Sequence, residues 1–185
     1  MQILHKNVGV VSFLGTYLEH QNILEKLGVM WTPVYTIADL ESVDALIVPG
    51  GEWPTLKFAL EPLLNKIAER TEEGMPLCLE GKSLLLLDEK QNTPLSIKKM
   101  QISDYRREYP SEIKDEIILS FADTKAYLAH WIHPVNIQKI TKKWQVLANY
   151  QGSPILIENQ NIIAHNFYSA FSKDYRLHEY FISKI

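Results

Sequence analysis

The chain has 185 residues, of which 46% are hydrophobic and 22% are charged. This composition is typical of a globular protein and excludes a disordered tail, a coiled coil and a collagen-like rod. The length predicts one domain over residues 1–185, large enough to bury a core without disulfides, and the chain has a single cysteine, Cys78. A formal net charge of −3 excludes an overall basic field that would attract nucleic acid.

Neither a targeting segment nor a membrane span is expected. The N-terminal apolar residues are interrupted by Gly9 and Ser12, unlike the continuous core of a signal peptide. Apolar runs such as residues 84–87 are far shorter than the ~20 residues that cross a bilayer. Because a single cysteine allows no disulfide within the chain, we expect a cytoplasmic protein without a membrane partner.

The first half of the chain alternates short apolar runs with segments of helical periodicity. Glycines follow two of the helical segments, at Gly28 and Gly74, and are suited to their C-caps. This alternation predicts a parallel sheet covered by helices on both faces. In chain order we expect strands at residues 8–14, 29–35, 45–48 and 77–79, and helices at residues 16–27, 56–71 and from 81 through 87.

The second half contains mostly short strands with few helices between them. Gln151 and Gly152 form a turn signal between two of these strands, which predicts a hairpin. The fold class is therefore α/β, with a mainly parallel central sheet and an antiparallel elaboration in the second half. The expected strands are residues 97–102, 117–121, 146–150, 154–158 and 162–167, and the expected closing helix is residues 173–184.

The candidate site residues lie where the parallel strands end, because ligands of open α/β sheets bind at the carboxyl ends of the strands. Gly50 and Gly51 either direct backbone N–H groups toward an anion or form a tight turn. Gly81 stands on a second strand end, which resembles a nucleophile elbow without a nucleophile. A phosphate loop is excluded there, since Pro76 occupies the position that needs a glycine.

The histidines do not predict a metal site. His130 and His133 have a spacing that binds metal on a helix, but Pro134 favours a strand end or loop. No neighbouring cysteine or carboxylate completes a ligand set in the sequence. We therefore expect no metal and no cofactor.

The order of three motifs resembles a known family. Residues 13–16 lead to Glu19 and His20, residues 49–53 read Pro-Gly-Gly-Glu-Trp, and residues 178–181 read His-Glu-Tyr-Phe. In this order the chain resembles the class I glutamine amidotransferases, most closely the glutaminase subunits of pyridoxal 5'-phosphate synthase. The resemblance covers nearly the whole chain. It implies a three-layer flavodoxin-like fold, glutamine hydrolysis that supplies ammonia for vitamin B6 synthesis, and a synthase subunit as partner.

The catalytic residues that the resemblance implies are missing. The family carries Gly-Thr-Cys-Ala-Gly at its elbow, and the ungapped register places Gly81 where the cysteine belongs. Tyr168 stands in place of the general base and Ala170 in place of the carboxylate that orients it. Glycine offers no nucleophile, and a tyrosine with a pKa near 10 is a poor base at neutral pH.

The glutamine pocket of the family is also altered. Its two substrate-binding arginines fall on Ile102 and Ile132, which cannot bind a carboxylate. Leu14 replaces a glutamine near the expected synthase contact, and Trp53 replaces a small serine. The remaining candidates for a pocket are Gly50, Gly51, Glu52, Trp53, Glu80 and Lys82.

These observations predict a binding or regulatory protein that lacks the three catalytic residues of the family. Its expected partner is either a synthase-like subunit or a small molecule bound in the remnant pocket. The alternative is a working glutaminase with relocated groups, Cys78 as nucleophile and His165 as base. Each lies three residues before the family position, and an odd offset along a strand predicts the opposite face, about 10 Å away. We therefore disfavour that alternative.

Overall fold

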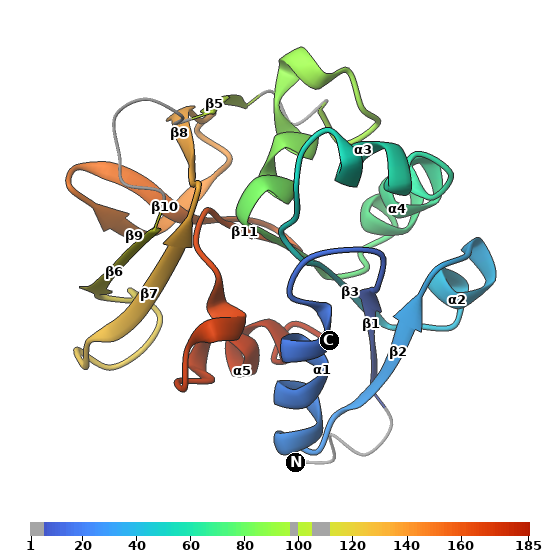
Figure 1. Ribbon diagram of the computed structural model, residues 1–185, viewed down its shortest axis with the longest axis horizontal. Helices are drawn as coiled ribbons and strands as arrows, with labels where there is room; N and C mark the ends of the chain where they lie inside the picture. The colour runs from blue at the N-terminus through green and yellow to red at the C-terminus, as the bar shows by residue number, and fades with distance from the viewer. Residues whose placement is uncertain (1–5, 97–99, 105–111) are drawn as a thin grey trace.

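The computed structural model describes residues 6–96, 100–104 and 112–185. Its centre is a seven-stranded sheet in the order β2-β1-β3-β4-β11-β10-β9 (Figure 1). The first five of these strands are parallel, β10 is antiparallel to its neighbour β11, and β9 is antiparallel to β10. The strands are β1 (Asn7–Val11), β2 (Met30–Val34), β3 (Ala45–Val48), β4 (Leu77–Glu80), β9 (Gln145–Tyr150), β10 (Ser153–Asn159) and β11 (Ile162–His165).

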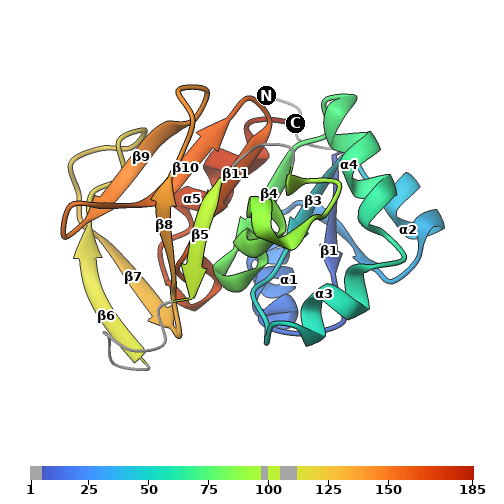
Figure 2. The same cartoon turned by 90° about the horizontal axis from the view of Figure 1, so that it is seen from above.

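The parallel part confirms the predicted α/β class. Its order is the 2-1-3-4-5 order of flavodoxin-like sheets, in which each apolar strand is covered on both faces. Two further strand pairs flank the central sheet on its antiparallel side (Figure 2). They are β5 (Gln101–Asp104) with β8 (Val135–Lys139), and β6 (Glu112–Ile117) with β7 (Tyr127–Ile132).

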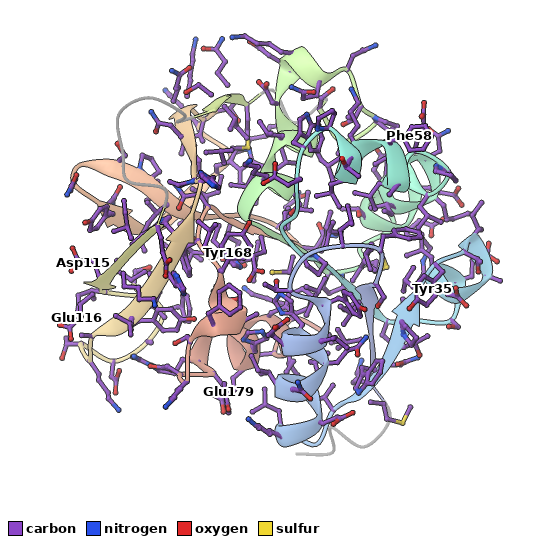
Figure 3. The ribbon with its side chains drawn as sticks, viewed as in Figure 1. Tyr35, Phe58, Asp115, Glu116, Tyr168 and Glu179 are labelled. Carbon is purple, nitrogen blue, oxygen red and sulfur yellow. The ribbon has the colours of Figure 1, made fainter. Side chains whose placement is uncertain are left out.

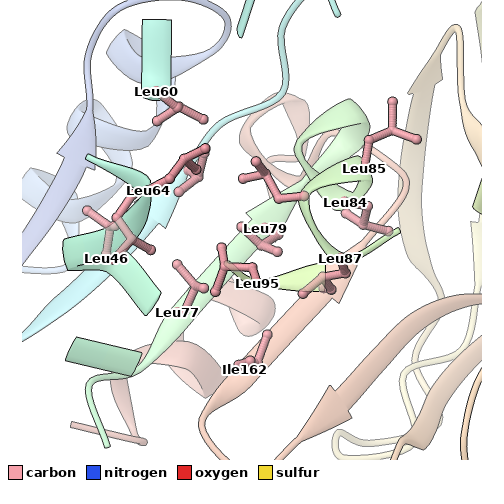
Figure 4. Close-up of a cluster of buried hydrophobic side chains, with 14 of the residues drawn as sticks. Leu46, Leu60, Leu64, Leu77, Leu79, Leu84, Leu85, Leu87, Leu95 and Ile162 are labelled. Atoms are coloured by element: carbon pink, nitrogen blue, oxygen red, sulfur yellow. The ribbon is translucent and has the colours of Figure 1, made fainter. Parts of the chain in front are cut away.

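The two faces of the sheet build two hydrophobic cores. Along β3, Leu46 and Val48 join one core, and Ala45 and Ile47 join the other, because side chains alternate along a strand. The first core packs against α3, α4 and the 3₁₀ helix η1 (Figure 4), and the second against α1 and α5. These elements are α1 (Tyr17–Lys26), α3 (Thr55–Leu60), α4 (Leu64–Glu72), α5 (Arg176–Ile182) and η1 (Gly81–Leu87).

Two helical predictions are corrected by the structure. The helix expected over residues 56–71 is two helices, α3 and α4, because Pro62 between them has no N–H to continue the helical hydrogen bonds. The short helix α2 (Ile37–Glu41) was not predicted. Its signal is the capping box of Thr36 and Asp39, which bond to each other's backbone N–H groups.

The strand predictions of the second half are correct only in part. Residues 97–99 lie outside the described residues, and β6 ends at Ile117 where a strand was expected to begin. The strands β7 and β8 were missed, although Tyr127, Ala129 and Trp131 alternate with less buried neighbours. The hairpin at Gln151 and Gly152 is confirmed, since both have positive φ and join β9 to β10.

The remaining short elements are the 3₁₀ helices η2 (Glu89–Gln91) and η4 (Ser169–Phe171). Across the described ranges, no helix has the length and apolar character needed to cross a membrane.

Candidate functional site

The turns after β1 and β3 meet at the carboxyl edge of the sheet. Gly15 has φ +76°, and a Cβ atom there would stand 1.6 Å from the carbonyl oxygen of Gly50. Leu14 approaches Gly51 in the same way, with 3.3 Å between the Leu14 Cβ and a Cβ placed on Gly51. The glycines are therefore required for the close approach of two backbone turns.

A third turn follows β4 at Gly81 and has the geometry of a nucleophile elbow. Gly81 has φ +60°, a left-handed conformation that favours glycine, and it leads directly into η1. The hydroxyl of Ser83 lies 2.9 Å from the carbonyl oxygen of Val48 and 2.8 Å from that of Glu80. These contacts hold the turn against the end of β3.

The ring of Tyr168 fills the space between the two glycine turns. A Cβ atom on Gly81 would stand 3.1 Å from its Cζ, and one on Gly50 would stand 2.7 Å from its Cε1. Tyr168 is only 8% exposed, and its N–H donates to the carbonyl oxygen of His130 at 2.7 Å. Figure 3 shows the ring near the middle of the molecule. Burial, and then the charges of Glu80 and Glu52, raise the pKa of the Tyr168 hydroxyl, so it remains protonated.

Glu80 is fully buried and accepts hydrogen bonds from elements at both ends of the chain. Thr16 Oγ1 donates to its carboxylate at 2.6 Å, and the backbone N–H and hydroxyl of Ser169 each donate at 2.8 Å. His20 Nε2 lies 3.1 Å from the same carboxylate, and the Ala170 N–H lies at 3.4 Å. Burial would raise the pKa of Glu80, but the charge and hydrogen bond of His20 outweigh it and hold the pKa well below its ordinary value.

Sequence reasoning placed Glu80 among the pocket residues, and the structure corrects this. Its carboxylate faces α1 and η4 and is 0% exposed, so it acts as an internal anchor. His20 Nδ1 in turn lies 3.0 Å from His178 Nε2, which extends the network to α5. Burial, followed by the charge of His20, lowers the pKa of His178 to about 3. We name Thr16, His20, Glu80, Ser169 and His178 the Glu80 network.

Lys82 lies on the other side of the elbow. Its side chain is only 5% exposed, and its Nζ stands 3.4 Å from Oε2 of Glu52, whose side chain is 72% exposed. Glu52 follows Gly50 and Gly51, so this pair joins the turn after β3 to the turn after β4. Trp53 is half-buried and packs against the first core.

Comparison with known proteins assigns the family. The SNO glutamine amidotransferase family matches residues 10–185. The chain belongs to this family. It is 33% identical to "Pyridoxal 5'-phosphate synthase subunit PdxT" of Thermoplasma acidophilum over 97% of this chain and 93% of that protein. It is 30% identical to the protein of the same name from Thermosipho africanus, over 96% of this chain and 98% of the relative.

Solved structures agree with the SNO family fold. A crystal structure of a glutamine amidotransferase superposes with a TM-score of 0.87 at 24% identity, over 96% of this chain and 97% of that one. The structure of PurLQS from Thermotoga maritima superposes with a TM-score of 0.71 at 16% identity, over 90% of this chain and 89% of that one. At these identities the likeness establishes the fold, which is the glutamine amidotransferase fold that the sequence motifs predicted.

Three further positions that the sequence analysis aligned with site residues of the family contribute only apolar packing or a backbone contact. Ile102 is 3% exposed and belongs to the first core, and Ile132 ends β7 in a partly buried place. Ala170 is 8% exposed and contributes only its backbone N–H, to Glu80.

Cys78 and His165, the two residues named for a relocated site, lie in contact in the structure. The Sγ atom stands 3.7 Å from Nε2, because Cys78 pairs with Ile163 in the register of β4 and β11 and His165 follows two residues later on the same face. Burial, then the charge of Glu80, raises the pKa of the Cys78 thiol, and burial lowers the pKa of His165 to about 4. At neutral pH both groups are therefore uncharged and the thiol is not activated.

His130 lies near the end of β7. A carboxylate does lie beside it, since His130 Nε2 stands 2.8 Å from Oε1 of Glu112 on the neighbouring strand. Over residues 6–96, 100–104 and 112–185, no group of three or more His, Cys, Asp or Glu side chains has a metal-binding arrangement.

Proposed function

We propose that this member of the SNO family is a catalytically degenerate homologue of the glutaminase subunit of pyridoxal 5'-phosphate synthase and works as a binding or regulatory protein. The observation that carries the proposal is the ring of Tyr168, which fills the space above Gly81 and Gly50. An elbow of this geometry needs a nucleophile beside a base. Gly81 supplies no nucleophile, and Tyr168 has a raised pKa and is unsuited to act as a base.

The packing around the elbow supports the same conclusion. A side chain at position 81 would point at the Tyr168 ring, 3.1 Å from its Cζ at the level of Cβ alone. A nucleophile at position 81 would therefore require the ring of Tyr168 to shift. The two substitutions form one packed arrangement, and restoring either residue alone does not rebuild a catalytic site.

Ammonia release from glutamine tests the proposal. The protein is assayed alone and with the synthase subunit of pyridoxal 5'-phosphate synthase, and the PdxT relative from Thermoplasma acidophilum serves as the positive control. We expect no ammonia above the blank without protein. Catalytic turnover by the unaltered chain that survives repurification would contradict the proposal.

The alternative, a glutaminase with relocated groups, is supported by the 3.7 Å contact between Cys78 and His165. Both residues are buried, at 5% and 0% exposure, so glutamine cannot reach the thiol without opening the strands. Cys78→Ala distinguishes the two functions. If ammonia release is detected and Cys78→Ala abolishes it while His133→Gln does not, the relocated site is correct.

For a macromolecular partner we propose a synthase-like subunit. The support is the match to proteins named as subunits of pyridoxal 5'-phosphate synthase, which extends over 96–97% of this chain. Size-exclusion chromatography of the chain mixed with such a subunit should give a co-eluting complex that releases no ammonia. Separate elution at concentrations where the PdxT relative forms a complex would refute this partner.

A further inference from the structure

The ammonium group of Lys82 is buried, and few acceptors or negative charges lie beside it. An ammonium has three donors, and burying a charge is costly unless it is paired and hydrogen-bonded. Within the described residues, the one polar partner of Lys82 is Glu52, at 3.4 Å. The 5% exposure of the lysine side chain contrasts with the 72% exposure of its partner, so the buried cation is held by a carboxylate that is largely in solvent.

Further donors lie in and beside the turn that carries Glu52, the partner of this ammonium. Glu52 directly follows Gly50 and Gly51, and in the part of the chain that the structure describes their backbone N–H groups donate no hydrogen bond. The hydroxyl of Tyr168 reaches the same turn, 2.9 Å from a Cβ placed on Gly50, and stays protonated because its pKa is raised by burial. Donors therefore outnumber acceptors here, and such a set is suited to an anion.

The carboxylate of Glu80 does not balance this set. It is fully buried on the other side of the elbow, where Thr16, His20 and Ser169 already satisfy it. Glu52 is thus the single described acidic group in contact with Lys82, and its exposure leaves it free to turn into solvent.

We propose that Lys82, with the turn of Gly50 and Gly51, forms a binding site for a small oxyanion, and that Glu52 occupies it as an internal substitute when no ligand is bound. The ligand class is a small molecule with a carboxylate or phosphate group. The inference rests on the proposed function, because it names the ligand class of the remnant pocket. No bond is made or broken, and binding displaces only the Glu52 carboxylate.

Isothermal titration calorimetry of the full chain at constant ionic strength tests this site. The probes are acetate, L-glutamate and inorganic phosphate, with chloride as the reference anion. We expect at least one oxyanion to bind and chloride not to compete. A preference for acetate or glutamate identifies a carboxylate ligand, and a preference for phosphate identifies a phosphate ligand.

Two variants should change the affinity in opposite directions. Lys82→Met keeps the apolar stem and removes the charge, so we expect a loss of about 10- to 100-fold in affinity. Glu52→Gln removes the internal competitor and should bind the same probe several-fold more tightly. Lys57→Met is the matched control, since Lys57 lies on α3 with its ammonium on the carbonyl oxygen of Gln91, and it should bind as the unaltered chain does.

Absence of binding in both the unaltered chain and Glu52→Gln would overturn the site. Binding that Lys82→Met leaves unchanged would overturn it as well, and Glu52→Gln keeps the test valid if Lys82→Met does not fold. Ammonia release is a separate measurement, so failure of the oxyanion site and failure of the proposed function are distinguished.

Discussion

At the scale of single residues, the side chains at the elbow pack closely against one another. Gly81 has the left-handed φ of an elbow but no side chain, and Tyr168 fills the volume that a side chain at position 81 would enter. Glu80, one residue earlier, binds the backbone N–H and hydroxyl of Ser169, one residue after the tyrosine. The buried carboxylate of Glu80 therefore holds the backbone next to Tyr168, and the tyrosine ring packs against Gly50 and Gly81.

Substitution of Gly81 should reveal this packing. Gly81→Ala introduces a Cβ at φ +60° and 3.1 Å from Tyr168 Cζ, whereas Gly28→Ala meets φ +69° with nothing within 4 Å. The backbone term alone costs about 1–2 kcal/mol, and we expect a further ~1–3 kcal/mol of overpacking at position 81. Urea unfolding of both variants measures the difference. Adding Tyr168→Ala should reduce the cost of Gly81→Ala, and equal costs in the two backgrounds would disprove the contact.

Labelling of Cys78 tests the buried thiol. Burial and the nearby charge of Glu80 raise its pKa, and its exposure is 5%, so little thiolate is available at neutral pH. We expect an aromatic disulfide reagent to react with the native protein only at the rate of unfolding, and at once in denaturing urea. Complete reaction of the folded protein within minutes would instead support the relocated nucleophile.

At the scale of elements, the Glu80 network joins the two ends of the chain to the middle of the sheet. Thr16 and His20 belong to the start of α1, Ser169 to η4 and His178 to α5, and all are linked through the end of β4. Such a network stabilises the packing of α1 and α5 only while each member is paired, because an unpaired buried polar group is costly.

Removal of the carboxylate should therefore be severe. Glu80→Ala leaves buried donors from Thr16, His20 and Ser169 without their acceptor, and we expect a loss of roughly 3–5 kcal/mol in the free energy of unfolding. Glu80→Gln keeps the shape and part of the hydrogen bonding and should lose less. The control is Glu61→Ala on the exposed end of α3, which should change stability by less than ~0.5 kcal/mol. Urea unfolding followed by circular dichroism measures all three.

At the scale of the whole molecule, two buried histidines predict the response to acid. Burial lowers the pKa of His178 to about 3 and that of His165 to about 4, below the ~6.5 of an unfolded histidine. The unfolded chain therefore binds protons below pH ~6.5 that the folded protein does not bind. Stability is fully present above this pH and falls as the pH decreases toward 4, by roughly 1.4 kcal/mol per pH unit for each histidine.

Glu80 extends the same trend to lower pH. Its pKa is held below its ordinary value by His20, so the stability that it contributes is fully present above the ~4.3 of an unfolded glutamate and is lost progressively as the pH falls below that value. Urea midpoints measured from pH 7 to pH 3 follow both losses. His178→Gln should flatten the slope, and the exposed His133→Gln should not. A stability that stays constant from pH 7 to pH 5 would contradict the buried, uncharged state of both histidines.

The accuracy of the sequence analysis differs between the two halves of the chain. The runs before Gly15, Gly50 and Gly81 are mostly apolar, as is typical of strands covered on both faces, and the strands β1, β3 and β4 overlap them. The strands β7 and β8 were missed because their outward side chains, such as Asn136 and Gln138, interrupt any apolar run. Pairing of β6 with β7 depends on a cross-strand register that local composition does not indicate.

The sequence by itself determined the fold class and the family, because these depend on local periodicity and on motifs within a few positions. The tertiary structure alone decided which distant side chains meet: Cys78 with His165, 87 residues apart, and Glu80 with Ser169, 89 residues apart. The physical reason is the parallel register of β4 with β11, which brings both pairs together. The same register places the segment after β11 beside the turn after β4, where the Tyr168 ring packs against Gly81. Such a register is set by packing of the whole sheet rather than by the residues of either strand.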